Sequence, residues 1–532
     1  KPSQLTYSKD HLFVHDFAIT HDGQHVTING HGSKSVNDTL TVDLSDVDVE
    51  YVLDLVNFHS VDFSGLASGR AQVAALFATP SAEADLTVRK FLFEGGRMGT
   101  LTANAAWNTE KNRIDIHGIC NDGPDAVTHI DGFIDPSSPG EIDLTILALG
   151  THIDFAHSFT SAFASRVEGQ GNGNVRIFGP LNAINMQGSC VVSGEVDIKQ
   201  LGTTYRLEND SEWFEPDLIA FDHAPMYDRD GNSASVNGRL YHHNLSHWTF
   251  DIDVSADNLL GYDFHDFGDM PFYGTIYGSG NVGIIGRPGS IVFDIDVNAQ
   301  PNSILVYNAS VPDAISRQEF ITWREKHEAD SLSTLNPSPS TFNPPPSTKS
   351  SDTDMTLNFL VHCTPSSTVR LLMDARTGDY ITLNGDGSFR ASYYNKGTFN
   401  MFGTYVVDRG TYNITIQELI KKDFTFQRGG TIAFSGNPFN AQLNLQAQHT
   451  VSGVSLSDLN VGRSFSSNTV RVNCLMNIGG TAGAPRVDFD LSMPTVSADE
   501  QQMVRSVING QQEMNQQVIY LLGLGRFYPQ TG

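Results

Sequence analysis

Hydrophobic and polar residues alternate strictly in short stretches from one end of the chain to the other. Examples are TVDL (41–44), EIDLTI (141–146), DIDV (251–254 and again 294–297), AQLNLQAQ (441–448) and VDFDL (487–491). An alternation of period two predicts β-strands with one apolar face and one polar face. We therefore expect an all-β chain that carries much of its acidic charge on a solvated sheet face.

Pairs of Asp or Asn with Gly separate many of these stretches. Such pairs favour the tight turns of β-hairpins, so turns are predicted at each of them. They are Asp22-Gly23, Asn29-Gly30, Asp122-Gly123, Asp131-Gly132, Asp230-Gly231, Asn237-Gly238, Asn384-Gly385 and Asp386-Gly387.

The stretch GTFNMFGTYVVDRGTYNIT (397–415) predicts a hairpin of its own. One side of its first strand carries four large side chains, Phe399, Met401, Tyr405 and Val407. Asp408-Arg409-Gly410 then predicts a tight turn, with a second strand resuming near Tyr412.

A loose internal repeat overlies the alternation. Segments that begin at Ser68, Asn172, Ser279 and Gly479 share an early Gly, a Pro several residues later and an alternating strand. Such recurrence is typical of an array that lengthens by adding similar strands. The expected architecture is an elongated, curled β-sheet that forms a groove.

The sequence divides into four expected parts. Residues 1–310 form the β-groove repeat region, and 311–354 contain a short helix (312–330) followed by a disordered segment rich in Ser and Pro. Residues 355–496 form a second β domain. Residues 497–532 form a C-terminal helix, and Ser497 and Glu500 at its start predict a capping box.

Composition narrows the class of partner. The formal net charge is −27 and Lys and Arg form no cluster, so nucleic acid is not an expected partner. The four cysteines are far apart in sequence, which predicts buried apolar residues and leaves a long-range disulfide open. No run of about 18 apolar residues occurs. Since the sequence has no initiator Met, we expect it to be part of a longer chain.

Two polar clusters are candidates for metal sites, and each has a simpler interpretation. DRDGN (228–232) resembles the start of a calcium loop, but Ser233 and Arg239 replace the Gly and Glu that such a loop requires, so an Asp-Gly turn is favoured. His242, His243 and His247 lie in an alternating region, which favours exposed histidines at a hairpin.

No motif carries catalytic chemistry. The chain lacks a Gly-x-Ser-x-Gly elbow, a Walker loop and a His-Glu-x-x-His pair. Its many carboxylates lie on the polar faces of the predicted strands, where contact with solvent accounts for them without a catalytic role. A non-enzymatic protein is expected, with no catalytic residue, metal or cofactor.

The apolar stripe of the sheet has two interpretations that periodicity does not separate. If two sheets pack face to face, the stripe is a sandwich core. If one sheet curls without closing, the stripe lines a groove, for which lipid acyl chains are the natural occupant in water.

The stretch 385–451 resembles the C-terminal domain of the TamB family, whose name denotes a translocation and assembly module. The resemblance rests on Gly403, Tyr405, Gly410-Thr411-Tyr412, Phe424, Gly429-Gly430-Thr431-Ile432 and Gly436-Asn437-Pro438. The upstream stretch 228–264 is similar to the version found in Bacteroidota-type bacteria, and 515–527 also fits.

This resemblance implies a periplasmic protein whose full-length parent is anchored to the inner membrane. It implies a taco-like β-groove related to AsmA-like and bridge-type lipid transfer proteins. The implied role is to move phospholipids between the inner and outer membrane. An alternative is to assemble outer-membrane or secreted proteins, through strand-edge pairing, with a BamA-family barrel called TamA. The anchor is expected outside this sequence.

Residues on alternating apolar faces are the candidate groove lining, although ordinary core packing explains each one alone equally well. They are Ile252, Val254, Ile295, Val297, Tyr412, Ile414, Ile416, Phe424, Phe426, Ile432, Phe434, Leu443 and Leu445. A surface adhesin or carbohydrate-binding protein is a second alternative, against which the chain's four Trp residues weigh weakly.

Overall fold

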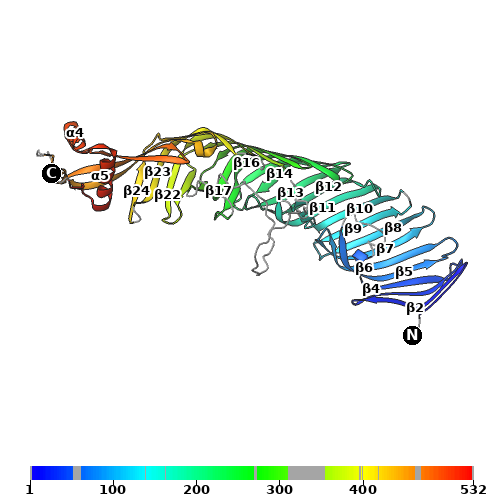
Figure 1. The fold of residues 1–532 in the computed structure, drawn as a ribbon. Coiled ribbons are helices and arrows are strands. Elements are labelled where there is room, and N and C mark those ends of the chain that lie inside the picture. Colours follow the sequence, from blue (N-terminus) through cyan, green and yellow to red (C-terminus); the bar gives the residue numbers. More distant parts are fainter. Residues whose placement is uncertain are drawn as a thin grey trace, which may run out of the picture. The chain divides into compact units, whose positions relative to one another are not determined.

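The computed structural model describes residues 3–51, 62–137, 139–161, 163–268, 272–309, 354–394, 397, 399–416, 419–461 and 469–529. The helix expected at 312–330 and the Ser- and Pro-rich segment that follows it to residue 353 lie outside these residues. The described residues contain 28 strands and few helices, so the predicted all-β class is confirmed (Figure 1). Two compact units divide the chain, Lys1–Ser255 and Ala256–Gly532, and the division falls inside a strand.

The first unit is a meander in which the strands from β1 to β15 each pair antiparallel with their neighbours in sequence. Its strands are β1 (Gln4–Ser8), β2 (His11–His21), β3 (Gln24–Gly32), β4 (Thr39–Asp48), β5 (Phe63–Ala74), β6 (Ser81–Phe93), β7 (Gly96–Asn108), β8 (Arg113–Asn121), β9 (Val127–Asp135), β10 (Glu141–His152), β11 (Ala164–Pro180), β12 (Asn185–Ile198), β13 (Thr203–Glu215), β14 (Leu218–Tyr227), β15 (Ser233–His243) and β16 (Ser246–Phe264), with α2 (Ala156–Thr160) before β11. β16 continues into the second unit.

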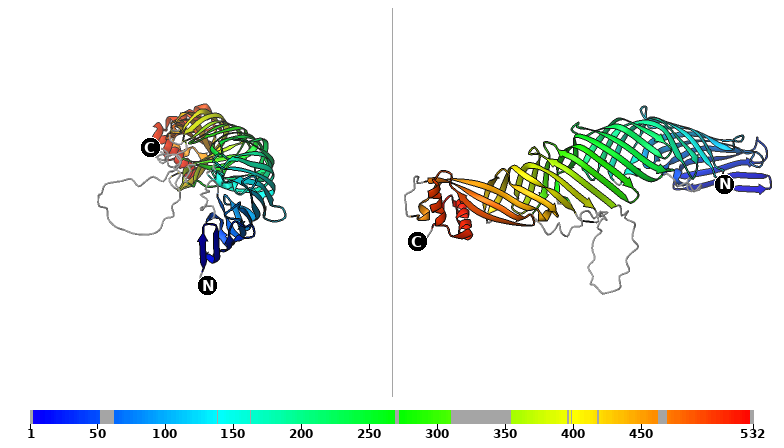
Figure 2. Two further views of the ribbon diagram at one scale, coloured as in Figure 1. Left: turned by 90° about the vertical axis from the view of Figure 1, so that its right-hand side faces the viewer. Right: turned by 90° about the horizontal axis from the view of Figure 1, so that it is seen from above.

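The second unit joins further strands to helices near its C-terminal end (Figure 2). Its elements are β17 (Phe272–Arg287), β18 (Ser290–Ala299), β19 (Ile304–Asn308), β20 (Asp354–Cys363), β21 (Thr368–Asp374), β22 (Asp379–Tyr394), β23 (Asn400–Ile416), β24 (Ile420–Phe426), β25 (Thr431–Gly436), η1 (Pro438–Asn440), β26 (Gln442–Ser455), η2 (Ser457–Leu459), β27 (Thr469–Thr481), β28 (Ala484–Ser492), α4 (Ala498–Ser506) and α5 (Gly510–Leu524).

A recurring β-bulge bends the strands. At Asp16 and Asp46 the backbone is left-handed (φ 50° and 53°), and the register with the next strand shifts. The N–H of Asp16 donates to Asn29 Oδ1 (2.7 Å) and that of Asp46 to Ser68 Oγ (2.9 Å). The same contact joins Gly150 to Asn172, Asn209 to Ser193, His223 to Asn237 and Asn258 to Ser279. Because a bulge increases local twist, this repetition curves the sheet.

The oxygen that binds each bulge belongs to a residue that directly precedes a glycine. At Gly69, for example, φ is +152° and a Cβ would lie 2.1 Å from the Asp85 carbonyl oxygen, so only glycine fits. Two pairs predicted as turns, Asn29-Gly30 and Asn237-Gly238, supply such a contact and lie inside strands. Three others, Asp131-Gly132, Asn384-Gly385 and Asp386-Gly387, also lie inside strands, so all five of these turn predictions are wrong. The pairs that connect strands, as predicted, are Asp22-Gly23, Asp122-Gly123 and Asp230-Gly231.

Three rows of the second unit's sheet each consist of two short strands that lie end to end. β18 and β19 both pair with β17, β20 and β21 both pair with β22, and β24 and β25 both pair with β23. The first two rows run parallel to each other, and their breaks are joined by a hydrogen bond from Thr368 N to Ser303 O (2.8 Å). The breaks thus lie side by side across the sheet.

The turn predicted at Asp408-Arg409-Gly410 is wrong, because β23 continues through it. Its register with β22 shifts at this point, so Asp408 is the extra residue of a bulge. Val407 exchanges hydrogen bonds with Gly429 and Gly430 at the break between β24 and β25. The predicted facing of the strand is confirmed, since Tyr405 and Val407 are buried.

The helix expected at the C-terminus is two helices, α4 and α5, separated at 507–509. The predicted capping box is present, with Glu500 N donating to Ser497 Oγ and Ser497 N donating to Glu500 Oε2. α5 packs against β24, β27 and β28. Buried Gln517 holds the chain after α5 by donating to Tyr528 O (3.1 Å) and accepting from Tyr528 N (2.8 Å).

Candidate functional site

One face of the first unit's sheet carries unbroken cross-strand rows of apolar residues, and we call it the inner face. The longest row crosses from β3 to β15 through directly paired residues: Val26, Leu44, Gly69, Leu86, Ala103, Gly118, Ile130, Ile146, Val175, Gly188, Phe214, Ile219 and Leu240. A neighbouring row contains Ile28, Val42, Ala71, Ala84, Ala105, Ile116, Gly132, Leu144, Ile177 and Met186. The register therefore aligns the alternating pattern of each strand into a continuous apolar surface.

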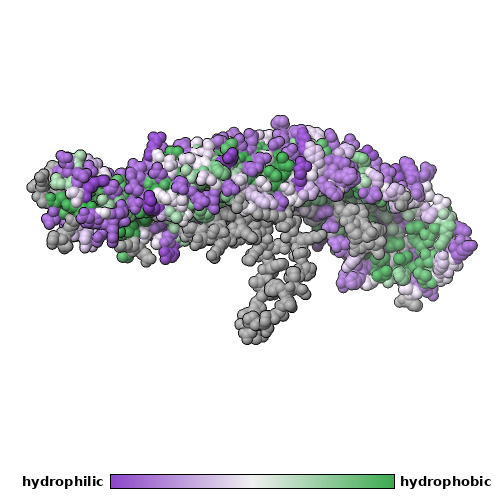
Figure 3. All heavy atoms as spheres, turned by 45° about the horizontal axis from the view of Figure 1, so that its top comes forward, coloured by the Kyte–Doolittle hydropathy of each residue, from purple (hydrophilic) through white to green (hydrophobic). Residues whose placement is uncertain are grey.

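No second layer covers this surface extensively within the part of the first unit that the structure describes. The principal contacts of each strand are with its ladder neighbours, apart from α2 against β11 and β7 near β10. The buried apolar cluster of this unit is small, with Ala67, Val88, Phe91 and Cys120 at its centre. Figure 3 shows hydrophobic residues gathered at the surface over the N-terminal strands. In this unit the apolar stripe is thus a partly exposed sheet face rather than a sandwich core.

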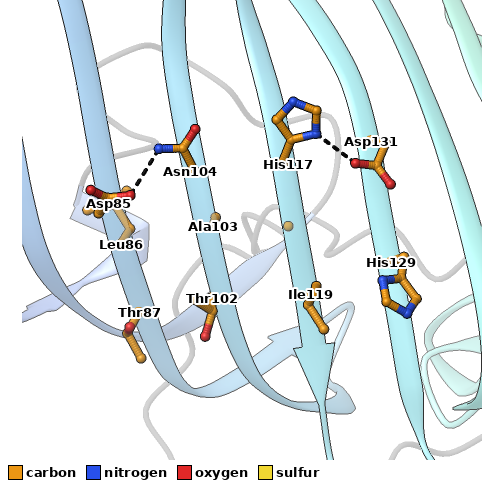
Figure 4. A pocket seen from close by; sticks show the side chains of 11 residues that line it. Asp85, Leu86, Thr87, Thr102, Ala103, Asn104, His117, Ile119, His129 and Asp131 are labelled. Carbon is orange, nitrogen blue, oxygen red and sulfur yellow. Dashed lines mark hydrogen bonds and ion pairs between the residues drawn. The ribbon is translucent and has the colours of Figure 1, made fainter.

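The opposite, outer face is mainly polar, although Ile119, Leu147 and Trp213 are exposed on it. A shallow hollow of about 330 Å³ lies there across β6 to β9 (Figure 4). Asn104 Nδ2 donates to Asp85 Oδ1 (2.9 Å), and His117 Nδ1 lies 2.7 Å from Asp131 Oδ1. These side chains satisfy one another in the open, so the hollow is a solvated polar surface and not an enclosed ligand pocket.

Nine of the predicted lining residues lie in or against the packed core of the second unit. Phe424, Phe426 and Leu445 are buried there, and Tyr412, Ile414, Ile416, Ile432, Phe434 and Leu443 pack against them. The same core contains Val504 of α4 and Val518, Leu521 and Leu522 of α5. Because helices cover this end of the sheet, core packing accounts for these nine residues.

The other four predicted residues lie on half-buried apolar faces. Ile252 and Val254 belong to β16 in the first unit, whereas Ile295 and Val297 belong to β18 in the second. Ile295 pairs with Val282 and Phe359 on its two sides, so its apolar row crosses three strands. The structure thus brings these predicted residues together as two pairs.

A pair of carboxyl groups on the inner face has no counterpart in the sequence prediction. Glu212 on β13 lies between Cys190 and Phe221 in a cross-strand row, and Asp210, 3% exposed, precedes it on the same face. Burial, then the Asp210 charge, raises the pKa of Glu212 to about 8, and burial also raises the pKa of Asp210. The sequence prediction missed the pair because Leu207 and Asp210 are three residues apart instead of two. The bulge at Asn209 nevertheless places them on the same face.

The cluster at 228–232 is a turn, as predicted. Asp228 Oδ1 accepts hydrogen bonds from the backbone N–H groups of Asp230 and Asn232 (both 2.9 Å), an arrangement typical of an Asx turn.

The histidine hairpin is partly as predicted. His243 is exposed at the end of β15, but the His242 side chain is fully buried, with its ring 4.7 Å from that of Trp248. Burial lowers the pKa of His242.

All four cysteines are free, with Cys120 and Cys474 buried as expected. Within the described ranges, no cluster of three or more His, Cys, Asp or Glu side chains is placed to hold a metal ion.

Comparisons with known proteins place the chain in a family. The model of the TamB C-terminal domain matches residues 224–532, which is more than half of the chain. No curated protein matches it. None of the helices in the described residues has the length and apolar character needed to cross a membrane. Both the match and the all-β sheet agree with the resemblance carried by residues 385–451, and the chain belongs to the TamB family, which supports a role in outer-membrane assembly.

Proposed function

We propose that this chain binds phospholipid acyl chains along the inner face of the first unit and moves them between the inner and outer membranes. The proposal places the protein in the periplasm, where the lipid supply would support outer-membrane assembly. The observation that carries it is the continuous apolar row from Val26 to Leu240 with no extensive covering layer in the described residues. Family membership supports the broader role but does not choose between lipid and protein as cargo.

An acyl chain suits this surface physically. Burial of a methylene group contributes about 0.8 kcal/mol, so contact along several neighbouring strands would bind a chain without any specific polar contact. The rows are uniform from strand to strand, which would permit movement along them with little change in free energy. The acyl chains would supply this binding, and the phosphate groups would remain in water, so no basic pocket is needed for them.

The decisive experiment compares two adjacent residues of β10 that face opposite ways. Ile146 lies on the inner face between Ile130 and Val175, and Leu147, 39% exposed, lies on the outer face. Purified wild type, Ile146→Asp and Leu147→Asp are examined by native mass spectrometry and lipid extraction. Bound phospholipid is expected in the wild type and in Leu147→Asp, and a several-fold loss in Ile146→Asp, because a carboxylate is costly to bury against hydrocarbon.

A well-folded wild type that carries no lipid would contradict the proposal. Equal lipid loss in both variants would also contradict it, because the effect would then not depend on the face. Circular dichroism and thermal unfolding check that both variants fold.

A further inference from the structure

We propose that Asp210 and Glu212 form a subsite for the primary ammonium headgroup of a phospholipid whose acyl chains lie on the inner face. The inference rests on the proposed function and adds to it a class of lipid. It gives the inner face a preference for ammonium-bearing phospholipids over anionic ones.

The position of the pair is the first argument. Glu212 interrupts a cross-strand row that otherwise contains Val88, Leu101, Cys120, Thr128, Ala148, Gly173, Cys190, Phe221 and Gly238. Asp210 lies opposite Val192, which in turn lies opposite Gly171. Two acidic side chains thus face the same side as the apolar rows, where the rest of the traced surface carries no charge.

The unmet hydrogen-bonding capacity of Asp210 is the second argument. Among the residues that the structure describes, its side chain is one of the most buried polar groups, and its Oδ1 has no hydrogen-bond partner there. Burial raises the pKa of both carboxyl groups, that of Glu212 to about 8, and a cation placed between them would favour their ionised forms. A buried acceptor with no partner is costly, so a cationic donor placed there would recover free energy.

The chemistry of the pair selects the headgroup. A primary ammonium has three N–H donors and one positive charge, which suit the free Asp210 oxygen and the Glu212 carboxyl group. A trimethylated ammonium offers charge without N–H donors, and an anionic headgroup would be repelled. The lipid tails tether the ammonium close to the pair, since Glu212 lies one row from Phe214 and Gly188.

The test measures which lipid the protein selects. The protein is incubated with vesicles of equal parts phosphatidylethanolamine, phosphatidylcholine and phosphatidylglycerol, re-isolated, and its bound lipids are quantified by mass spectrometry. We expect roughly tenfold enrichment of phosphatidylethanolamine over phosphatidylglycerol, which corresponds to about 1.4 kcal/mol. The variant Asp210→Asn/Glu212→Gln should bind the same total lipid with the enrichment lost.

The matched control removes two carboxylates from the outer face. Glu83 and Glu215 are exposed, so Glu83→Gln/Glu215→Gln should retain the enrichment. The amide variants are close in shape to the carboxyl groups and relieve burial of charge, so they should fold.

Several outcomes separate the two claims. Lipid bound by the wild type at the vesicle ratio, or enrichment that survives in the Asp210/Glu212 variant, would overturn the subsite and leave lipid binding intact. A folded wild type that binds no lipid would overturn the proposed function, and the subsite with it. If soluble ethanolamine removes the enrichment without displacing lipid, the pair recognises the headgroup itself; if it has no effect at high concentration, the subsite is contradicted.

Discussion

Glu212 makes the stability of the first unit depend on pH in a direction opposite to that of most carboxylates. Its folded-state pKa of about 8 lies above its ordinary value, so the folded state holds a proton that the unfolded state releases. The groups that face it are Asp210 on its own strand, Cys190 on β12 and Phe221 on β14. Of these, Asp210 adds to the shift and Cys190, whose pKa is raised to about 12, stays neutral.

We therefore expect the contribution of Glu212 to be fully present below its unfolded pKa and to be lost as pH rises through about 8. The free energy of unfolding should fall across this window, and Glu212→Gln should remove that part of the fall. Chemical denaturation at a series of pH values measures it. Identical pH profiles for wild type and variant would show that Glu212 titrates normally.

At the scale of single elements, the hydrogen bond at each bulge is the feature most open to test. Asn172 Oδ1 accepts from Gly150 N (2.7 Å), so Asn172→Ala should cost about 1 kcal/mol in the free energy of unfolding. Ser occupies the equivalent position in β5, β12 and β17, so Asn172→Ser should recover most of the loss. Denaturant melts of the three proteins provide the measurement. An Asn172→Ser variant no better than Asn172→Ala would mean that the bulge contacts are not equivalent.

The segment after α5 provides a second test at this scale. Phe527 is fully buried, and Phe527→Ala should destabilise the second unit by about 3 kcal/mol or more through the cavity it leaves. Tyr528, 36% exposed, contacts Gln517 through its backbone, so Tyr528→Ala should cost much less. Thermal unfolding distinguishes them, and equal losses would contradict the packing of Phe527.

At the scale of the whole molecule, the two units differ in how their apolar residues are covered. The second unit encloses a large core beneath α4 and α5, whereas the first has a single sheet with a small buried cluster. Backbone amides of β3–β12 should therefore exchange hydrogen faster than those of β22–β28. Addition of a short-chain phospholipid should slow exchange in β3–β12 and leave β22–β28 unchanged, because binding stabilises only the unit that binds.

Hydrogen exchange with mass spectrometry resolves the two regions. Protection gained in β22–β28 alone would place the lipid in the second unit and contradict the proposed function.

Strand facing was predictable from sequence, because period two alone determines which residues share a face. The bulges were not, since a spacing of three, as from Leu44 to Val47, looks like a lapse in the pattern until the partner strand is known. Predicted lining residues such as Phe424 lie in a core because α5, which comes much later in the sequence, packs against β24, β27 and β28. Such long-range covering leaves no trace in local periodicity.

Each bulge contains one extra residue, and regular alternation elsewhere in the strands limits how the length of such a chain can change. Deletion of Asp46 would remove the extra residue and leave Val47 on the face it shares with Leu44, whereas deletion of Asp43, in a regular part of β4, would turn Val42 away from that face. Insertion of a whole hairpin, in contrast, would preserve every existing pairing and extend the apolar rows by two strands. Length in a sheet of this kind is therefore gained or lost in pairs of strands, and within a strand a single residue can be lost only at a bulge without turning its neighbours to the other face.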